Sequence, residues 1–360
     1  MRSIGYMTLN WAFSLKPIQP DGCAWYRCYL PMTELSKYGW SVGMAMPGYD
    51  DDHGFVLDNF GENQMYGWDI IIFKLIMLQT VVERMDEARA KGQKIFVDID
   101  DFFEGLDETN LAYRNTDPNR SEEVNREHYY EIIRKADGVI TSTAFLRDFY
   151  ISQGIKNVFM VRNGIDINRW KRKGDHSRWL PTVGWVGATP WRSKDLETMQ
   201  PFFGDFMEKS RLSFHHAGHI KNAAQAVDQL GLHPITKVTY EPRKPILSYP
   251  EMFRKIDIGI VPLNNIPFNH AKSTIKGLEY TAAGIPFIAS YSPEYEMLAQ
   301  QGVGRVAYTP EDWVNHLTEL QDPKIRKEEI DKNYENLKLT QTMEVRGHEW
   351  NEVMEQILAL

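Results

Sequence analysis

The sequence of 360 residues contains only two cysteines, Cys23 and Cys28, both in one short segment. Such sparse cysteine usage excludes a disulfide framework and a cysteine-rich zinc site, and it indicates a reducing compartment. No run of about 18 apolar residues is present, so we expect no transmembrane helix. The first residues lack an uninterrupted apolar stretch with a small-residue cleavage site. We therefore expect no signal peptide and a cytoplasmic location.

The chain also lacks an excess of basic residues, low-complexity tracts and repeats of solenoid spacing. Its formal charge is −8, which disfavours binding of nucleic acid by the whole surface but allows a local basic groove. Hydrophobic residues make up 42% and charged residues 25% of the chain, which is typical of a globular protein. No amphipathic basic helix suited to a membrane surface is evident, so we expect no stable membrane association.

Apolar runs alternate with amphipathic ones along the whole chain, a pattern that predicts βαβ units and mostly parallel sheets. A first series predicts strands at 3–9, 40–47, 69–73, 94–98, 138–142 and 157–162, with helices at 25–38, 79–91 and 122–136. A second series predicts strands at 182–186, 211–216, 236–240, 256–261 and 286–290, with helices at 193–209, 248–255, 273–283, 310–320, 324–337 and 342–358. We therefore predict an α/β chain with two Rossmann-like, doubly wound domains, residues 1–165 and 166–340, followed by a helical segment at 341–360.

The segment 267–290 contains the most informative pattern. Ser273 is a natural N-cap for the predicted helix, whose free amides, together with Lys272 and Lys276, would suit a diphosphate. Thr274 lies in the same turn, and Glu279 follows where a carboxylate could accept hydrogen bonds from two ribose hydroxyls. The alternative is a surface helix with a capping serine and two solvated lysines.

This segment resembles the donor-site signature of retaining GT-B glycosyltransferases, a large family that includes sucrose synthases and mannosyltransferases. Glu279 matches the second, ribose-binding glutamate of that signature, and Gly284 and Pro286 match its ending. The first glutamate, which lies near the transferred sugar in the family, falls on Ala271, where this chain departs from the pattern. Asn269 and His270 are adjacent and could contact the sugar instead.

Three further segments resemble the same family. Residues 183–196 resemble the strand, loop and helix that open the donor domain, with Gly187 in the loop and Lys194 at the diphosphate-binding lysine. The partner arginine of the family falls on Ala188, and Arg192 could supply the missing charge as a forked donor to phosphate oxygens. Residues 161–166 resemble the interdomain hinge.

Residues 21–27 resemble the first loop of the family, which contains Gly22 and faces the donor phosphates. We expect Trp25 and Arg27 in this loop to contact the acceptor. The resemblance implies a GT-B fold with two domains facing across a cleft and a last helix that crosses back to the first domain.

The acidic stretch 97–101 allows a second interpretation. An Asp-x-Asp at a strand end is how GT-A transferases bind a divalent metal, but the two-domain pattern favours acidic residues that line a cleft. We therefore expect no metal requirement, and we assign Asp100 and Asp101, with Lys194 and Arg192, as candidate catalytic residues, Asp100 also contacting the acceptor. Residues 102–110 resemble a stretch found in bacteriophage-encoded members of the family.

A basic, aromatic segment, 162–179, could form a groove for a phosphate backbone or for unstacked bases, or it could be a solvated linker with packed tryptophans. His215, His216 and His219 follow one another closely, and no carboxylate or cysteine joins them at metal-ligand spacing. We expect them in a loop or near the nucleobase.

Together these patterns predict a hexosyltransferase that uses a UDP- or GDP-sugar such as UDP-glucose, with retention of configuration and with no permanently bound cofactor. The acceptor that we expect first is a hydroxymethylated base in phage DNA. The alternatives are a virion protein, a saccharide or lipid, or a non-catalytic scaffold that only binds nucleotide sugars.

Overall fold

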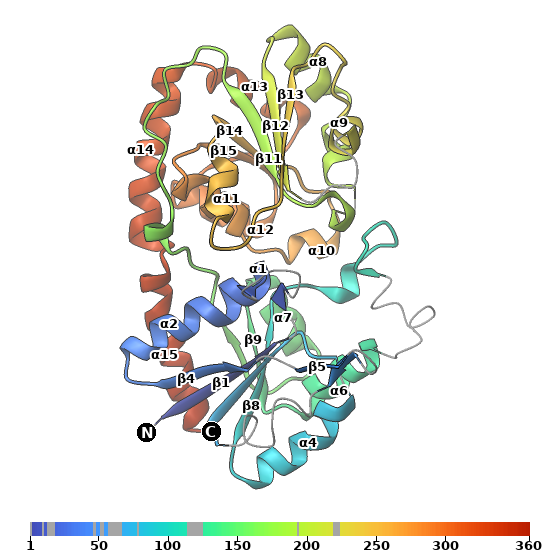
Figure 1. The fold of residues 1–360 in the computed structure, drawn as a ribbon, viewed down its shortest axis with the longest axis vertical. Helices are drawn as coiled ribbons and strands as arrows, with labels where there is room; N and C mark the ends of the chain where they lie inside the picture. The colour runs from blue at the N-terminus through green and yellow to red at the C-terminus, as the bar shows by residue number, and fades with distance from the viewer. Residues whose placement is uncertain are drawn as a thin grey trace. The chain divides into compact units, whose positions relative to one another are not determined.

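The computed structural model describes residues 2–8, 11–12, 19–45, 48–50, 54–56, 67–77, 79–113, 125–192, 194–218 and 224–360. The chain divides into two compact units (Figure 1). Unit 1 comprises residues 1–103, 114–164 and 343–360, and unit 2 comprises residues 104–113 and 165–342. Within the described residues, no helix is both long and apolar enough to span a bilayer.

Unit 1 is built on a six-stranded sheet in the order β10-β9-β8-β7-β1-β4, and all of its neighbouring strands are parallel. The strands are β1 (Ser3–Thr8), β4 (Ser41–Ala45), β7 (Ile70–Lys74), β8 (Lys94–Ile99), β9 (Gly138–Thr141) and β10 (Val158–Met160). β7 and β9 are buried along their whole length. Near-continuous apolar runs are what a parallel sheet covered on both faces requires.

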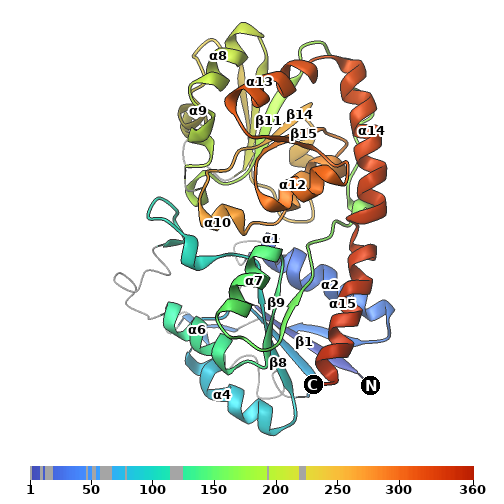
Figure 2. The same cartoon turned by 180° about the vertical axis from the view of Figure 1, so that it is seen from behind.

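Helices cover both faces of this sheet. α2 (Leu30–Lys37) packs against α15 (Met343–Leu358), and α4 (Gln79–Ala90) packs against α6 (Asn125–Lys135) (Figures 1 and 2). The remaining helices are α1 (Gly22–Ala24), which leads through a π-helical turn (Trp25–Tyr29) into α2, and α7 (Ala144–Ser152). Two short antiparallel ribbons complete the unit, β2 (Trp11–Ala12) with β3 (Gln19–Pro20) and β5 (Gly48–Asp50) with β6 (Gly54–Val56).

Unit 2 is also built on a six-stranded sheet, in the order β13-β12-β11-β14-β15-β16, and all of its neighbouring strands are parallel. Its strands are β11 (Thr182–Val186), β12 (Ser213–Gly218), β13 (Val238–Pro242), β14 (Ile258–Val261), β15 (Phe287–Ser290) and β16 (Arg305–Ala307). Its helices are α8 (Phe202–Lys209), α9 (Ala224–Leu230), α10 (Pro267–His270), α11 (Ile275–Ala282), α12 (Pro293–Gln300), α13 (Pro310–Glu319) and α14 (Pro323–Thr340).

One face of the unit 2 sheet packs against α8, α9 and α13 around Phe203, Phe214, Leu230 and Leu317, all of which are fully buried. On the other face, Tyr280 of α11 and Tyr295 of α12 contact the sheet. Helices on both faces of a parallel sheet define the doubly wound architecture. The predicted α/β class with two such sheets is therefore confirmed.

The helix predicted at 193–209 is wrong in part, and Ser193 itself lies outside the described residues. The chain forms 3₁₀ turns at Thr189–Trp191 and Leu196–Met199, and a regular α-helix begins only at Phe202. Pro201 explains the interruption because it has no amide hydrogen to donate within a continuous helix. The elements α7, α9, α12 and β16 were not predicted from the sequence.

His215 and His216, expected in a loop or near the nucleobase, lie inside β12, which overlaps the strand predicted at 211–216. His219 lies outside the described residues. His215 is fully buried, and its Nδ1 lies 2.8 Å from Thr239 Oγ1 on β13. His216 stacks on Trp185 with ring centroids 4.9 Å apart. Burial lowers the pKa of His215 to about 4, because an imidazolium without water is unfavourable.

We predict that acidification destabilises unit 2. Between pH 6.5 and pH 4 the unfolded chain binds a proton at His215 that the folded chain does not, so stability falls as the pH falls through this range. A shift of this size corresponds to roughly 3 kcal/mol at 1.36 kcal/mol per pKa unit. Urea unfolding at pH 7 and pH 4.5 should show a smaller loss for His215→Gln than for the wild type, whereas His348→Gln, at an exposed position, should behave as the wild type. An equal loss in all three would contradict this assignment.

Candidate functional site

In unit 2 the two segments that sequence analysis assigned to the donor meet at Asp195, a residue that the analysis did not single out. Its side chain is 1% exposed. Asp195 Oδ1 accepts hydrogen bonds from the Asn264 amide at 3.0 Å and from Asn269 Nδ2 at 2.6 Å. Lys272 Nζ lies 3.7 Å from Asp195 Oδ2. One buried carboxylate thus joins the loop after β11 to α10 and the turn that follows it.

Lys194 precedes Asp195 and is exposed, with a φ of 62°. A left-handed backbone is unfavourable for a residue with a β-carbon, and such conformations cluster at functional sites. The two hydrogen bonds to Asp195 hold the backbone immediately beside this lysine.

A second link between the segments runs through Tyr280 of α11. The Tyr280 hydroxyl accepts from the Val186 amide and donates to the Gly184 carbonyl, both at 3.1 Å on β11. Gly187 follows the last residue of this strand. The ends of β11 and β12 approach closely here, since a β-carbon on Gly218 would lie only 1.8 Å from the Gly187 oxygen. Glycine at these positions therefore lets the two strand ends approach.

Glu279 lies at the centre of a compact polar group on α11. Its side chain is 2% exposed, and its Oε2 accepts from Lys276 Nζ at 2.6 Å and from the Tyr249 hydroxyl at 3.0 Å. Lys276 Nζ also donates to the Tyr249 hydroxyl at 2.6 Å. Burial lowers the pKa of Lys276, Glu279 opposes that shift, and the charge of Arg192 adds to it.

One detail differs from the sequence prediction. Ser273 is not the N-cap of α11, since Thr274 occupies that position and makes no side-chain capping hydrogen bond. Ala271 is fully buried, and His270 Nε2 lies 2.7 Å from Asn265 Oδ1. Sequence spacing missed Tyr249 because it lies 30 positions from Glu279, on a 3₁₀ turn (Tyr249–Phe253).

In unit 1 two of the predicted acceptor residues, Arg27 and Asp100, belong to a buried ionic network. Arg27 is fully buried and forms a forked pair with Asp98, with Nε–Oδ1 at 3.0 Å and Nη2–Oδ2 at 2.6 Å. Its Nη1 donates to the Val161 carbonyl at 2.7 Å and to Asn163 Oδ1 at 3.1 Å. The expectation that Arg27 contacts an acceptor is therefore corrected, because all these partners lie in the interior of the unit.

Lys74 extends this network toward the carboxyl edge of the sheet. It is buried, pairs with Asp100, and lies 3.8 Å from Asp98. Burial lowers the pKa of Lys74, but the two carboxylates outweigh burial and raise it above its ordinary value. The side chain of Asp100 is partly exposed, as is that of Asp101. Trp25 is buried and stacks on Tyr29, and Gly22 lies in α1, where Asp21 caps the helix.

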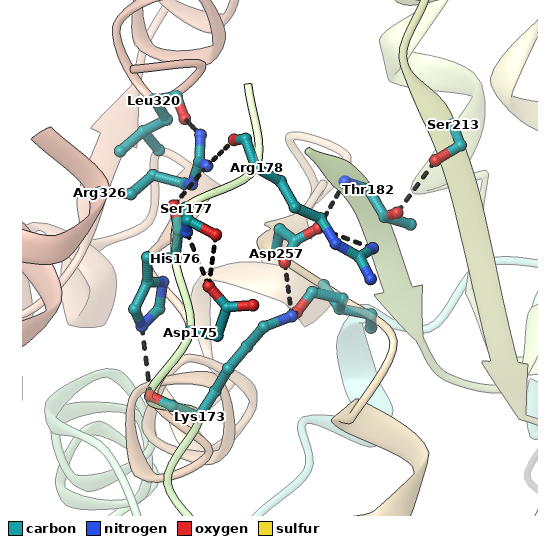
Figure 3. A network of polar contacts seen from close by, with 11 residues as sticks. Lys173, Asp175, His176, Ser177, Arg178, Thr182, Ser213, Asp257, Leu320 and Arg326 are labelled. Carbon is teal, nitrogen blue, oxygen red and sulfur yellow. Dashed lines mark hydrogen bonds and ion pairs between the residues drawn. The ribbon is translucent and has the colours of Figure 1, made fainter. Parts of the chain in front are cut away.

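The basic segment predicted as a possible groove uses several of its charges inside unit 2. Asp257 accepts from the Thr182 amide at 2.8 Å and from Lys173 Nζ at 2.5 Å, and Arg178 lies 3.8 Å away (Figure 3). Arg172 pairs with Asp331. These contacts favour the structural interpretation of the segment over a nucleic-acid groove.

Among the described residues, no group of three or more histidine, cysteine, aspartate or glutamate side chains could hold a metal ion. The site therefore consists of cations, carboxylates, amides and hydroxyls. Such groups can bind an anion and the hydroxyls of a polar ligand.

No known protein-family model matches the sequence, and no curated protein matches it. Solved structures do resemble it. Sucrose-phosphate synthase from Thermosynechococcus elongatus is 13% identical with a TM-score of 0.67, and the match covers 100% of both chains. Anabaena HepE in complex with UDP is 15% identical with a TM-score of 0.64, covering 99% of this chain and 100% of HepE.

TarM of S. aureus is 15% identical with a TM-score of 0.57, and the match covers 79% of this chain and 54% of TarM. The chain thus spans about half the length of TarM. These similarities and the two parallel six-stranded sheets show that the chain has the GT-B fold.

We predict that Asp195→Ala destabilises the chain by about 2–3 kcal/mol, because two donors lose their buried acceptor. Asp195→Asn retains an acceptor oxygen for both donors and should lose about 1 kcal/mol or less. Asp205→Asn, on an exposed side chain of α8, serves as the control and should stay within about 0.5 kcal/mol of the wild type. Urea unfolding measures all three, and equal stability of the Ala and Asn variants would contradict this role.

We also predict that Arg27→Met destabilises unit 1 by about 3–5 kcal/mol, because Asp98 would become a buried charge without its main partner. The double variant Arg27→Met/Asp98→Leu should recover most of that loss, since it removes both buried charges. A double variant no more stable than Arg27→Met would show that the arginine acts by packing rather than by pairing.

Proposed function

We propose that this chain transfers a hexosyl group from a nucleotide sugar to a hydroxyl acceptor. The observation that carries the proposal is the buried carboxylate of Glu279 in unit 2, with Lys276 Nζ at 2.6 Å and the Tyr249 hydroxyl at 3.0 Å. Arg192, in the loop after β11, adds a further positive charge that acts on Lys276. The GT-B fold supports this function, and the similar HepE has been solved in complex with UDP and with UDP-glucose. These complexes favour a uridine donor over the guanosine alternative.

We assign the donor contacts as follows. The diphosphate would contact Lys194 and Arg192, whose charges suit phosphate oxygens. Because Lys276 covers Glu279, donor binding would draw the Lys276 ammonium from the carboxylate toward the diphosphate. Glu279 would then accept hydrogen bonds from the ribose hydroxyls. Lys276 and Glu279 would therefore bind the donor together, with the ammonium on the diphosphate and the carboxylate on the ribose.

The reaction breaks the bond between the sugar and the diphosphate, so negative charge grows on the leaving group. Fixed cations stabilise that charge more in the transition state than in the ground state. We propose retention of configuration, with the acceptor oxygen attacking the face from which the phosphate departs and its proton passing to the leaving diphosphate. This route needs no protein nucleophile.

For the acceptor, we propose a hydroxyl of a saccharide or a related polyol. Sugar ligands occur in similar structures, since HepE has been solved with UDP and glucose and TarM with α-GlcNAc-glycerol and UDP. The DNA alternative depends on the phage-like stretch 102–110, and the internal pairing of Lys173 and Arg172 weakens the basic groove that it would use. Asp100 and Asp101 are partly exposed and remain our candidates for contact with the acceptor in unit 1.

We predict that Lys194→Ala lowers turnover of UDP-glucose by about tenfold or more, the loss expected for about 1.4 kcal/mol of transition-state stabilisation. Glu279→Gln keeps the size of the side chain and an acceptor oxygen for Tyr249, and it should lower turnover by a similar factor because it weakens the contact with ribose. Lys324→Ala, on an exposed side chain of α14, should behave as the wild type.

The measurement is release of UDP from a panel of nucleotide sugars, first without an acceptor and then with saccharides, hydroxymethylated DNA or protein. A wild type that binds UDP-glucose but releases no UDP under any condition would support the non-catalytic scaffold. Unchanged turnover in both variants would refute the site.

A further inference from the structure

Two tyrosines follow neighbouring strands at the carboxyl edge of the unit 2 sheet. Ser290 and Ala307 pair as the last residues of β15 and β16, so Tyr291 and Tyr308 are the next residues of the two parallel strands. Their rings stack with centroids 5.4 Å apart and an interplanar angle of 27°. Tyr291 is 46% exposed and Tyr308 is 61% exposed. A stacked aromatic pair therefore faces solvent at the edge where doubly wound sheets bind ligands.

The backbone on both sides holds the two rings in place. The Tyr291 amide donates to the Ala307 carbonyl at 3.1 Å. The Tyr308 amide donates to Asp312 Oδ2 at 3.0 Å as part of the turn that caps α13, and its hydroxyl bonds to Glu296. Tyrosines fixed in this way offer a large contact area and lose little conformational entropy on binding.

The tyrosine pair also adjoins the proposed donor site. The Leu263 amide, at the start of the turn after β14, donates to Ser290 Oγ at 3.0 Å. The next residue of that turn, Asn264, donates to Asp195. Parallel strands lie about 4.8 Å apart, so the pair lies one to two strand spacings from the end of β14.

The charges around the pair decide which planar ligand suits it. A flat aromatic surface can stack on a nucleobase or on the apolar face of a sugar ring. Three carboxylates accompany Tyr308, those of Glu296, Glu311 and Asp312. Like charges disfavour the phosphates of a nucleic acid, whereas an uncharged sugar ring meets no such repulsion. The surroundings thus favour a neutral saccharide.

We propose that Tyr291 and Tyr308 form a subsite that stacks on an uncharged hexose ring. The proposal rests on the proposed function, because the ring would belong either to the acceptor saccharide or to the sugar of the donor. Contact with the rings removes apolar surface from water on both partners, and the ordered pair needs no rearrangement. The subsite would extend the donor site along the same sheet edge.

The test compares Tyr291→Ala and Tyr308→Ala with Trp179→Ala, whose side chain is 68% exposed but lies before β11, at the opposite edge of the sheet. Calorimetry with UDP, UDP-glucose, maltotetraose and a single-stranded oligothymidylate measures binding to the full chain. We expect both tyrosine variants to lose about tenfold in affinity for maltotetraose, within the range of one aromatic stacking contact. Tyr308→Phe should retain this affinity, and Trp179→Ala should bind maltotetraose as the wild type does. The affinity for UDP should be the same in all variants.

If the variants instead weaken UDP-glucose and leave both UDP and maltotetraose unchanged, the ring belongs to the donor sugar, and the subsite stands. The subsite is refuted if the wild type binds UDP but the tyrosine variants bind every sugar ligand as the wild type does. It is also refuted if the tyrosines govern binding of oligothymidylate. A wild type that binds no UDP or UDP-glucose contradicts the proposed function, and binding of maltotetraose then decides the subsite separately.

Discussion

A single buried carboxylate, that of Asp195, accepts hydrogen bonds from residues 69 and 74 positions further along the chain. Because the ends of β11 and β14 lie side by side in the parallel sheet, the loops that follow them must meet, and Asp195 fixes how they meet. Lys194 keeps its left-handed backbone beside this carboxylate, and Lys272 lies within ion-pair distance of it. The geometry of the proposed diphosphate contacts therefore depends on Asp195, which need not touch the ligand itself.

Unit 1 also contains a buried ionic cluster, but the charges of this cluster cancel. Arg27 and Lys74 are balanced by Asp98 and Asp100, so this cluster carries no net charge and offers little attraction to an anion. In unit 2, Lys194 is exposed, and the positive charge of Arg192 acts on Lys276. This contrast supports placing the nucleotide in unit 2 and leaving unit 1 to a neutral acceptor.

The sequence predicted the fold well because apolar runs in parallel sheets are continuous and easily recognised, as in β7 and β11. It predicted less about the site. Glu279 and Lys194 were proposed because their segments resemble a known donor-site signature, whereas Tyr249 and Asp195 act through contacts between distant segments that no local pattern records. Arg27 was misplaced for a related reason: nothing in its neighbours reveals that Asp98 lies against it in space. The interruption of the predicted helix at Pro201, by contrast, could have been predicted from the sequence, because proline has no amide hydrogen to donate.

Ala271 limits how this site can work. Ala271 is fully buried, and it stands where the signature that its segment resembles has a glutamate. Neighbouring Asn269 is itself engaged with Asp195. In the proposed reaction, stabilisation of the developing charge would then come mainly from the leaving-group side, through Lys194, Arg192 and Lys276. Such a site would bind the diphosphate and ribose that nucleotide sugars share, and it would leave recognition of the sugar ring to other surfaces, for which the tyrosine pair beside β15 and β16 is suitably placed.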